Sequence, residues 1–287
     1  MSFPLHGALV ENPFPSAIFQ TNRFVRVYLP PSYPAEAKRH YPVLYLHDGQ
    51  NCFSSAGPHA AFGWGNWELD RTVDRLVSEK KMAEIIMVAV DCSEKRYSEY
   101  RGATNASGAS GLHKNYTRFL IEELKPHIDR TYRTLKDPAN TGVMGSSMGG
   151  ICSLSLGWEH PEIFGKLASI SGAFQVEKRA FINQVLKPYN GTVKPLKIYI
   201  DSGKIDHSGG DDGLEETEAA VKELRRIGWG DGNLFHFIDL PLTAEALQGY
   251  DLNEEKFREA QKSQHNEFYW RLRAWRALTF LFPPASN

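Results

Sequence analysis

The sequence has no uninterrupted apolar stretch of the roughly 20 residues that a membrane-spanning helix needs. It has only three cysteines, Cys52, Cys92 and Cys152, and their odd number and wide spacing predict neither a disulfide framework nor a zinc site. Neither sign of charge is in excess, because 33 Lys and Arg face 34 Asp and Glu. We therefore expect no nucleic acid and no membrane surface as a partner.

The N-terminus also lacks a basic segment followed by an apolar core, so we expect no secretory signal. Together with the cysteine usage, this predicts a cytoplasmic setting. No internal repeat, low-complexity tract or linker divides the 287 residues, and we expect one domain over residues 1–287. Whether the chain forms a homo-oligomer stays open.

The hydrophobic pattern predicts two extended N-terminal segments, 17–20 and 24–29, and then a regular alternation of strands and helices. The later strands are expected at 43–46, 84–90, 141–144, 167–170, 196–200 and 234–238. The helices are expected at 67–79, 116–128, 148–158, 176–186, 215–227 and 267–281. Wholly apolar strands are typical of a parallel sheet that is covered on both faces. The pattern therefore predicts an α/β sandwich whose sheet is mostly parallel, with antiparallel N-terminal strands.

One motif indicates chemistry: Gly145-Ser146-Ser147-Met148-Gly149 has the G-x-S-x-G pattern of a nucleophile elbow. It lies between a predicted buried strand and a predicted helix, which is the context that this tight turn requires. The small residues at both ends let the chain turn sharply and push the serine hydroxyl outward. The start of the following helix offers free N–H groups and a positive dipole end. We therefore interpret Ser147 as a nucleophile rather than as part of a plain glycine- and serine-rich loop.

A serine needs a base to remove its proton and an acid to orient that base. In α/β-hydrolases they follow the serine in the order acid, then histidine. Four histidines follow Ser147: His160 ends the elbow helix, His236 lies inside a strand pattern, and His207 lies beside the candidate acids. His265 precedes the last helix on a loop that returns to the strand ends, so we predict it to be the base.

The acid is expected in the loop after the strand 196–200, where four aspartates occur. A glycine turn swings Asp206 back over the strand end, so we predict Asp206, with Asp201 as the alternative. Asp211 and Asp212 are expected to begin the next helix, where carboxylates suit the dipole. The spacing of these aspartates does not match a calcium loop, so we expect no metal.

Acyl transfer also needs two N–H donors for the oxyanion. One is the N–H of Met148, the residue after the nucleophile. The other is expected from the loop His47–Asn51, where the N–H of Gln50 is our candidate, although Asp-Gly and Asn also form ordinary turns. The aromatic residues that follow this loop are equally compatible with a substrate pocket and with core. These aromatic residues are Phe53, Phe62, Trp64 and Trp67.

Several segments together resemble the putative esterase family, in its esterase D and enterochelin-esterase-like branch of the α/β-hydrolases. They include YPVLYLHDGQN, IIMVAVD followed by Arg96, Glu99 and Tyr100, FLIEELKPHIDRTYRT, GVMGSSMGG, IYIDSGKID and HNEFYWRLRAWRALTFLF. The resemblance extends over residues 24–282. It implies an α/β-hydrolase fold with helices on both faces, and hydrolysis of carboxylic esters without metal or organic cofactor. By motif position it also implies a triad of Ser147, Asp206 and His265, with Gln50 and Met148 as oxyanion donors.

We therefore expect a serine esterase whose substrate is a small acyl, aromatic (feruloyl-like) or carbohydrate ester. An acyltransferase or a thioesterase like S-formylglutathione hydrolase would use the same triad. A non-catalytic binding protein would not need a serine, an acid and a histidine together. Arg96 and Glu99 are expected to form a structural ion pair first, and substrate contacts second.

The connection 240–264 is longer than such connections usually are. Leu242, Leu247, Tyr250 and Leu252 give it an apolar side. Since it leads from a strand end to His265, we predict that it forms a wall or partial lid over the site.

Overall fold

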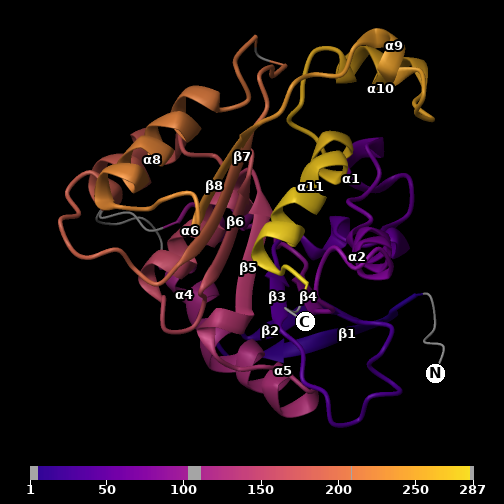
Figure 1. The fold of residues 1–287 in the computed structure, drawn as a ribbon, viewed down its shortest axis with the longest axis vertical. Coiled ribbons are helices and arrows are strands. Elements are labelled where there is room, and N and C mark those ends of the chain that lie inside the picture. The colour runs from indigo at the N-terminus through magenta and orange to yellow at the C-terminus, as the bar shows by residue number, and fades with distance from the viewer. Residues whose placement is uncertain (1–5, 103–110, 208, 285–287) are drawn as a thin grey trace.

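The computed structural model describes residues 6–102, 111–207 and 209–284. Within these residues, eight strands form one sheet in the order β1-β2-β4-β3-β5-β6-β7-β8 (Figure 1). They are β1 (Ala8–Ser16), β2 (Thr21–Leu29), β3 (Val43–Leu46), β4 (Ile86–Val90), β5 (Thr141–Ser146), β6 (Lys166–Ile170), β7 (Lys197–Ser202) and β8 (Leu234–Ile238). β2 is antiparallel to β1 and to β4, and the remaining pairs are parallel. The predicted mostly parallel sheet with antiparallel N-terminal strands is confirmed.

The N-terminal hairpin corrects one prediction. Residues 17–20, predicted as a strand, form the turn between β1 and β2, and Ser16 pairs with Thr21 across it. The strand is the preceding segment. Its Pro13 and Pro15 made a strand look unfavourable there, so it was not predicted. Proline is tolerated there because β1 is an edge strand and need not donate every ladder hydrogen bond.

Helices cover both faces of the sheet (Figure 1). One face packs against α4 (Leu112–Arg118), η3 (Phe119–Leu124), α5 (Lys125–Thr131), α6 (Met148–Glu159), η5 (Phe181–Leu186) and α8 (Leu214–Ile227). The other face packs against α2 (Leu69–Ser78) and α11 (Glu267–Leu281). The shorter helices are α1 (Ala60–Gly63), α3 (Arg96–Tyr100) and α7 (Val176–Ala180). The predicted helix over 116–128 is continuous through Pro126 because η3 is a π-helical turn that precedes it.

The strand pattern explains why the core has two halves. In β3 every residue is buried, and successive side chains point to opposite faces. Val43 and Tyr45 join the cluster under α4 to α8, whereas Leu44 and Leu46 join the cluster under α2 and α11. The central strands are therefore held from both sides, and their carboxyl ends form a rigid edge.

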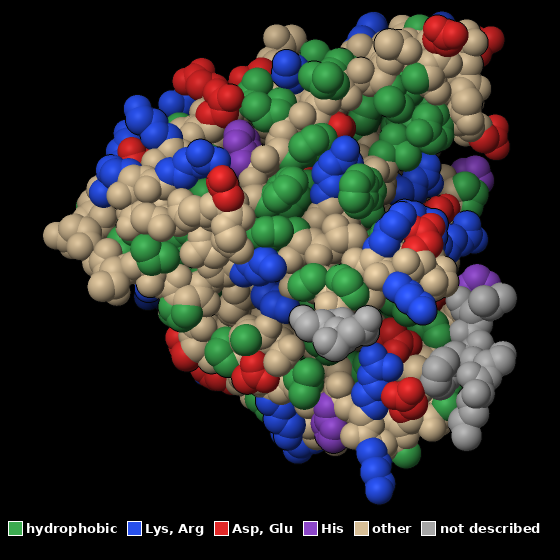
Figure 2. All heavy atoms as spheres, in the orientation of Figure 1, with side chains coloured by type: hydrophobic (Ala, Val, Ile, Leu, Met, Phe, Trp, Pro, Cys, Tyr) green, Lys and Arg blue, Asp and Glu red, His purple; other side chains and the backbone are tan. Residues whose placement is uncertain are grey.

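Above this edge lies the long connection before α11, which carries α9 (Ala244–Leu247) and α10 (Glu254–Ala260) (Figure 1). Its apolar side packs on the first turn of α11: Leu247 and Ala260 form a small cluster with Phe268 and Tyr269. The Tyr269 hydroxyl donates to the Ala260 carbonyl at 3.0 Å. Figure 2 shows hydrophobic side chains gathered around this segment, interspersed with Lys and Arg.

Candidate active site

Ser147 lies on a sharp turn between β5 and α6, with φ 54° and ψ −120°. A positive φ is strained for a residue other than glycine and persists only where its surroundings enforce it. A Cβ on Gly145 would lie 2.7 Å from the Gly149 carbonyl carbon, so only glycine fits there. The strand-turn-helix geometry predicted for this motif is confirmed. Met148 is the first residue of α6, so its N–H has no acceptor within the helix.

The structure brings Ser147 and His265 together: the serine Oγ and the imidazole Nε2 are 2.9 Å apart. The loop of His265 is tied to the loop after β7, because the Gln264 N–H donates to the Ile205 carbonyl at 3.0 Å. The imidazole ring packs edge-on against Trp270, with centroids 5.0 Å apart. These contacts fix the ring over the serine.

The acid that meets His265 is Asp212, and not Asp206 as predicted from the sequence. Asp212 Oδ1 is 2.6 Å from His265 Nδ1, and the carboxyl group is buried. Its Oδ2 accepts the Gly203 N–H and the Ser171 hydroxyl, both at 2.6 Å. Since a carboxylate only accepts hydrogen bonds, this contact places a proton on Nδ1 and leaves Nε2 free to accept from Ser147.

The two aspartates favoured by the sequence have other partners. Asp206 Oδ1 accepts the N–H of His207 at 2.6 Å and lies 3.5 Å from the Ser263 hydroxyl. Asp201 is fully buried, where it accepts the Ser171 N–H at 3.0 Å and the Tyr199 hydroxyl at 2.8 Å. Burial raises the pKa of the Asp201 carboxyl.

The loop conformation explains why Asp212, and not Asp206, contacts His265. Asp212 has φ 57°, a left-handed conformation that aspartate adopts more readily than most residues. This turn points its side chain back toward His265. Asp211 is the residue at the start of α8: its carboxylate accepts the N–H groups of Leu214 at 3.2 Å and Glu215 at 3.0 Å. Asp211 and Asp212, the adjacent aspartates before Gly213, therefore have different roles. The presence of two aspartates at one helix start was the only sign in the sequence that one of them could contact His265.

A buried hydrogen-bond network supports Asp212 from behind. The Ser171 hydroxyl, which donates to Asp212, accepts from Arg273 and, at 3.2 Å, from Trp270 Nε1. Arg273 is 1% exposed and lies near three carboxylates. The ion-pair distances are 3.2 Å to Asp201, 3.7 Å to Asp212 and 3.3 Å to Asp239. One guanidinium therefore stabilises the negative charges behind the histidine.

The loop after β3 passes close to the elbow and contains Gln50 within a short helical turn, η1 (Gly49–Asn51). The Gln50 side chain accepts the Cys92 N–H at 3.0 Å, which anchors the loop to the end of β4. A Cβ on Gly49 would lie 2.8 Å from the backbone of Val90, so the loop needs glycine at this close approach. Gln50 and Ser147 line the same cavity.

Arg96 and Glu99 both form ion pairs, as the sequence predicts, but with different partners. Arg96 makes a bidentate contact to Asp48 on the loop after β3, with both N–O distances 2.7 Å. Glu99 is buried and holds Arg23 of β2 at 2.8 and 2.9 Å. Arg96 therefore stabilises the loop after β3, whereas Glu99 stabilises the sheet through Arg23 of β2.

The serine and histidine open into a cavity of about 540 Å³, which lies within the usual range of small-ligand sites. Aromatic side chains line much of it, namely Phe62, Trp64, Trp67 and Trp270. Phe53 is completely buried and belongs to the core. Sequence reasoning missed Trp270 and Glu267, which follow His265 on the first turns of α11. Their positions near the predicted base were the only signal.

Two titratable groups in the cavity wall are biased toward their neutral forms by burial. Burial raises the pKa of Glu267 to about 7, the nearby Asp48 raises it further, and the charge of Arg96 opposes this. Asn51 Nδ2 donates to Glu267 Oε1 at 3.2 Å. Burial lowers the pKa of His47 to about 3, and its Nδ1 lies 2.9 Å from the Tyr116 hydroxyl.

In 6–102, 111–207 and 209–284, no three His, Cys, Asp or Glu side chains are grouped so that they could hold a metal ion. The same residues contain no helix long and apolar enough to cross a membrane.

Comparison with protein families matches residues 16–277 to the family described as putative esterase. A relative in Bacillus subtilis (strain 168), described as uncharacterized protein YbbA, is 25% identical over 222 residues, which cover 74% of this chain and 82% of the relative. An endo-1,4-beta-xylanase/feruloyl esterase of Xylanibacter ruminicola is 28% identical over 174 residues. That match covers 58% of this chain and 22% of the longer relative.

Solved structures agree on the fold. A ferulic acid esterase superposes with a TM-score of 0.71 at 18% identity, covering 98% of this chain and 99% of that chain. The ferric enterobactin esterase of Salmonella typhimurium superposes with a TM-score of 0.69 at 17% identity, covering 96% of this chain and 58% of that chain. At such identities the likeness establishes the fold alone, and the predicted α/β-hydrolase fold is confirmed.

Proposed function

Because the chain belongs to the putative esterase family and is a carboxylic ester hydrolase, we propose that it works as a serine esterase with Ser147 as nucleophile. In this proposal His265 is the base and Asp212 orients it. The observation that carries the proposal is the continuous contact from Ser147 through His265 to Asp212, at 2.9 and 2.6 Å. This is the arrangement by which unrelated hydrolases activate serine.

The acylation step follows from these contacts. Ser147 Oγ attacks the ester carbonyl carbon while its proton passes to His265 Nε2. The resulting imidazolium is stabilised by Asp212. The oxyanion is held by the N–H of Met148, at the N-terminus of α6, and by the N–H of Gln50 as second donor. Collapse breaks the bond to the alcohol oxygen, which takes the proton from His265 and leaves.

Water completes the reaction. It attacks the acyl-serine carbonyl while His265 removes one of its protons, and a second oxyanion forms in the same place. Its collapse returns the proton from His265 to Ser147 Oγ and releases the carboxylic acid. The sum is ester plus water giving acid plus alcohol, so the enzyme needs no redox partner.

We further propose an aromatic acyl group, such as a feruloyl-like one, as the preferred acid part. The tryptophans that line the cavity support this, because flat aromatic surfaces bind aromatic rings well. The endo-1,4-beta-xylanase/feruloyl esterase and the ferulic acid esterase that this chain resembles support the same acyl class. A carbonyl at Ser147 would lie beside Trp270, which packs on His265.

The experiment is a panel of methyl and p-nitrophenyl esters with aliphatic and hydroxycinnamoyl acyl groups, assayed with wild type and Ser147→Ala. We expect kcat to fall by about three to six powers of ten in the variant. We also expect kcat/KM to be highest for the aromatic acyl esters. An alanine variant that keeps a tenth of wild-type kcat would show that Ser147 is not the nucleophile. Adding alcohols to the assay measures how much acyl group goes to water and how much to another acceptor.

A further inference from the structure

The two edges of the sheet differ in how they are protected. β1 forms one edge, where Pro13 and Pro15 remove backbone N–H groups. Prolines of this kind keep an edge strand from pairing with another chain. β8 forms the other edge, beside β7 (Figure 1), and its sequence Leu-Phe-His-Phe-Ile contains no proline and no Asp, Glu, Lys or Arg. In the part of the chain that the structure describes, no strand pairs with the outer side of β8.

The backbone groups that face this outer side follow from the pairing of β8 with β7. The Ile198 N–H donates to the Asn233 carbonyl at 2.7 Å, and the Asp239 N–H donates to the Ser202 carbonyl at 2.8 Å. Alternate residues of a paired strand face the neighbouring strand. The odd-numbered residues of β8 therefore bond to β7, and the even-numbered residues direct their N–H and C=O groups to the open edge.

The sequence of β8 is nearly symmetric about His236. A second copy that pairs antiparallel around a twofold axis at this residue places Leu234 opposite the partner's Ile238. The same axis places Phe235 opposite the partner's Phe237. The even-numbered residues then exchange backbone hydrogen bonds, and the phenylalanines form the closer pairs between them, where aromatic side chains stabilise a sheet. One surface thus fits its own copy, as a twofold interface requires.

The side chains around β8 favour the same partner. Phe235, Leu240 and Trp275 are 38%, 63% and 38% exposed, although all three are large and apolar. Like charges directly opposite one another destabilise a strand pair, and β8 has no Asp, Glu, Lys or Arg to meet its own copy. Burial lowers the pKa of His236, so the two imidazoles at the axis are uncharged at neutral pH.

We propose that two copies of this chain associate through β8, antiparallel around a twofold axis at His236, so that their sheets join into one continuous sheet. Five paired residues and the exposed side chains beside them bury on the order of 1,000 Å² in total, at the low end for a specific interface. We therefore expect a reversible dimer with a Kd of about 1–100 μM.

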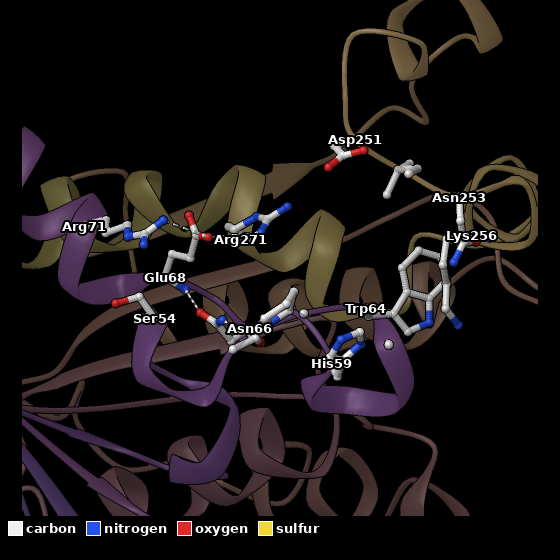
Figure 3. Close-up of a pocket in the computed structure, with 15 residues that line it drawn as sticks. Ser54, His59, Trp64, Asn66, Glu68, Arg71, Asp251, Asn253, Lys256 and Arg271 are labelled. Carbon is white, nitrogen blue, oxygen red and sulfur yellow. Dashed lines mark hydrogen bonds and ion pairs between the residues drawn. The ribbon is translucent and has the colours of Figure 1, made fainter.

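This association goes beyond the proposed reaction and does not depend on it. The described residues that line the catalytic cavity come from the loops after β3, β4 and β7, the elbow, the segment 62–67 and the region 265–270. Those that line the neighbouring pocket in Figure 3 come from the segment 54–71, the connection before α11 and Arg271. None of them belongs to β8, so the pairing leaves the walls of both cavities in place.

The test is sedimentation velocity of the full chain at concentrations from about 1 μM to 1 mM, a range that spans the expected Kd. We expect wild type to pass from monomer to dimer and no further, because a twofold interface closes. His236→Pro removes the outward N–H at the axis, a change that an edge strand tolerates. Phe235→Lys replaces an aromatic pair and brings two cations together across the axis. Each variant is expected to raise Kd by about 10-fold or more.

Phe24→Lys is the matched control, because Phe24 is 37% exposed and lies on β2, away from this edge. It should leave Kd within about twofold of wild type. The Tm and the kcat per chain on a methyl ester show whether each variant is folded. Both are measured beside the association, so a loss of dimer is not mistaken for a loss of fold.

His236→Cys tests the register. In the pair at the axis the Cα atoms would lie about 5.5 Å apart, within the range of a disulfide. Under mild oxidation this variant should form a covalent dimer, whereas wild type and Phe24→Cys should remain single chains on a denaturing gel. Failure of His236→Cys to cross-link faster than Phe24→Cys would contradict the register and overturn the proposal.

Two results of the sedimentation series would also overturn it. A wild type that stays monomeric up to about 1 mM would show that solvent or a different partner covers β8. A dimer whose Kd changes by less than about twofold in both His236→Pro and Phe235→Lys would place the interface elsewhere on the molecule.

Discussion

Replacing Glu267 by glutamine tests the electrostatics of the site, because burial in the cavity wall raises the pKa of this carboxyl from 4.5 to about 7. Between these two values the folded protein keeps a proton that the unfolded chain releases. The proton therefore stabilises the fold at low pH, and this contribution is lost as the pH rises through about 7. Glutamine has no proton to lose, and its oxygen can still accept from Asn51.

The magnitude follows from the difference between the two pKa values. If the whole difference in pKa acts on folding, ionisation of Glu267 lowers the free energy of unfolding by roughly 3 kcal/mol at alkaline pH. We expect Glu267→Gln to be more stable than wild type by about 1–3 kcal/mol at pH 8, because the variant does not bury a charge. At pH 4 to 5 both proteins present a neutral group, so their stabilities should nearly coincide.

The assay is urea unfolding at closely spaced pH values from 4.5 to 8.5, analysed by linear extrapolation. Glu122→Gln is the control. Arg118 lowers the pKa of the Glu122 carboxyl, so removing this carboxyl should change the free energy of unfolding with pH in the opposite direction. A stability difference between Glu267→Gln and wild type that is the same at pH 5 and pH 8 would refute the raised pKa.

Two further predictions concern the acid and the elbow. Asp212→Asn should lower kcat by about 10⁴-fold because the histidine loses its orienting carboxylate, whereas Asp206→Asn should stay within about threefold of wild type; the opposite ranking in steady-state assays would restore Asp206 as the acid. Gly145→Ala should lower kcat by about 10²-fold or more, because its Cβ would force the backbone of Gly149 away by several tenths of an ångström. It should also cost about 1–3 kcal/mol of stability; an alanine variant with normal kcat and Tm would show that the elbow has room.

Most of the fold could be predicted from the sequence because its central strands are short, largely apolar and separated by clear helices. The elbow was equally accessible, since G-x-S-x-G constrains both sequence and backbone. The N-terminal strand could not be predicted, because Pro13 and Pro15 are unusual in strands and are tolerated here only because β1 is an edge strand. The connection 240–264 stays a predicted wall or partial lid; its apolar residues pack with the first turn of α11 and with Trp64, which also lines the catalytic cavity.

The aspartate that contacts His265 shows where sequence order stops being sufficient. Four aspartates follow the strand in the right order, and the choice among them depends on a left-handed turn at Asp212. Composition favours aspartate at a helix start, and Asp211 fulfils that role. The network from Arg273 through Ser171 to Asp212 joins residues that are distant in the chain, so no local pattern could reveal it.

The central claim is that Ser147 is activated by His265 and forms an acyl-enzyme. Its most direct test is labelling with a serine-reactive fluorophosphonate, followed by mass spectrometry of the peptide that contains the elbow. We predict stoichiometric labelling at Ser147 in wild type, and labelling slowed by at least about 10³-fold in His265→Ala, because the base is then missing. Labelling at Ser146 or elsewhere, or an unchanged rate in His265→Ala, would contradict the account.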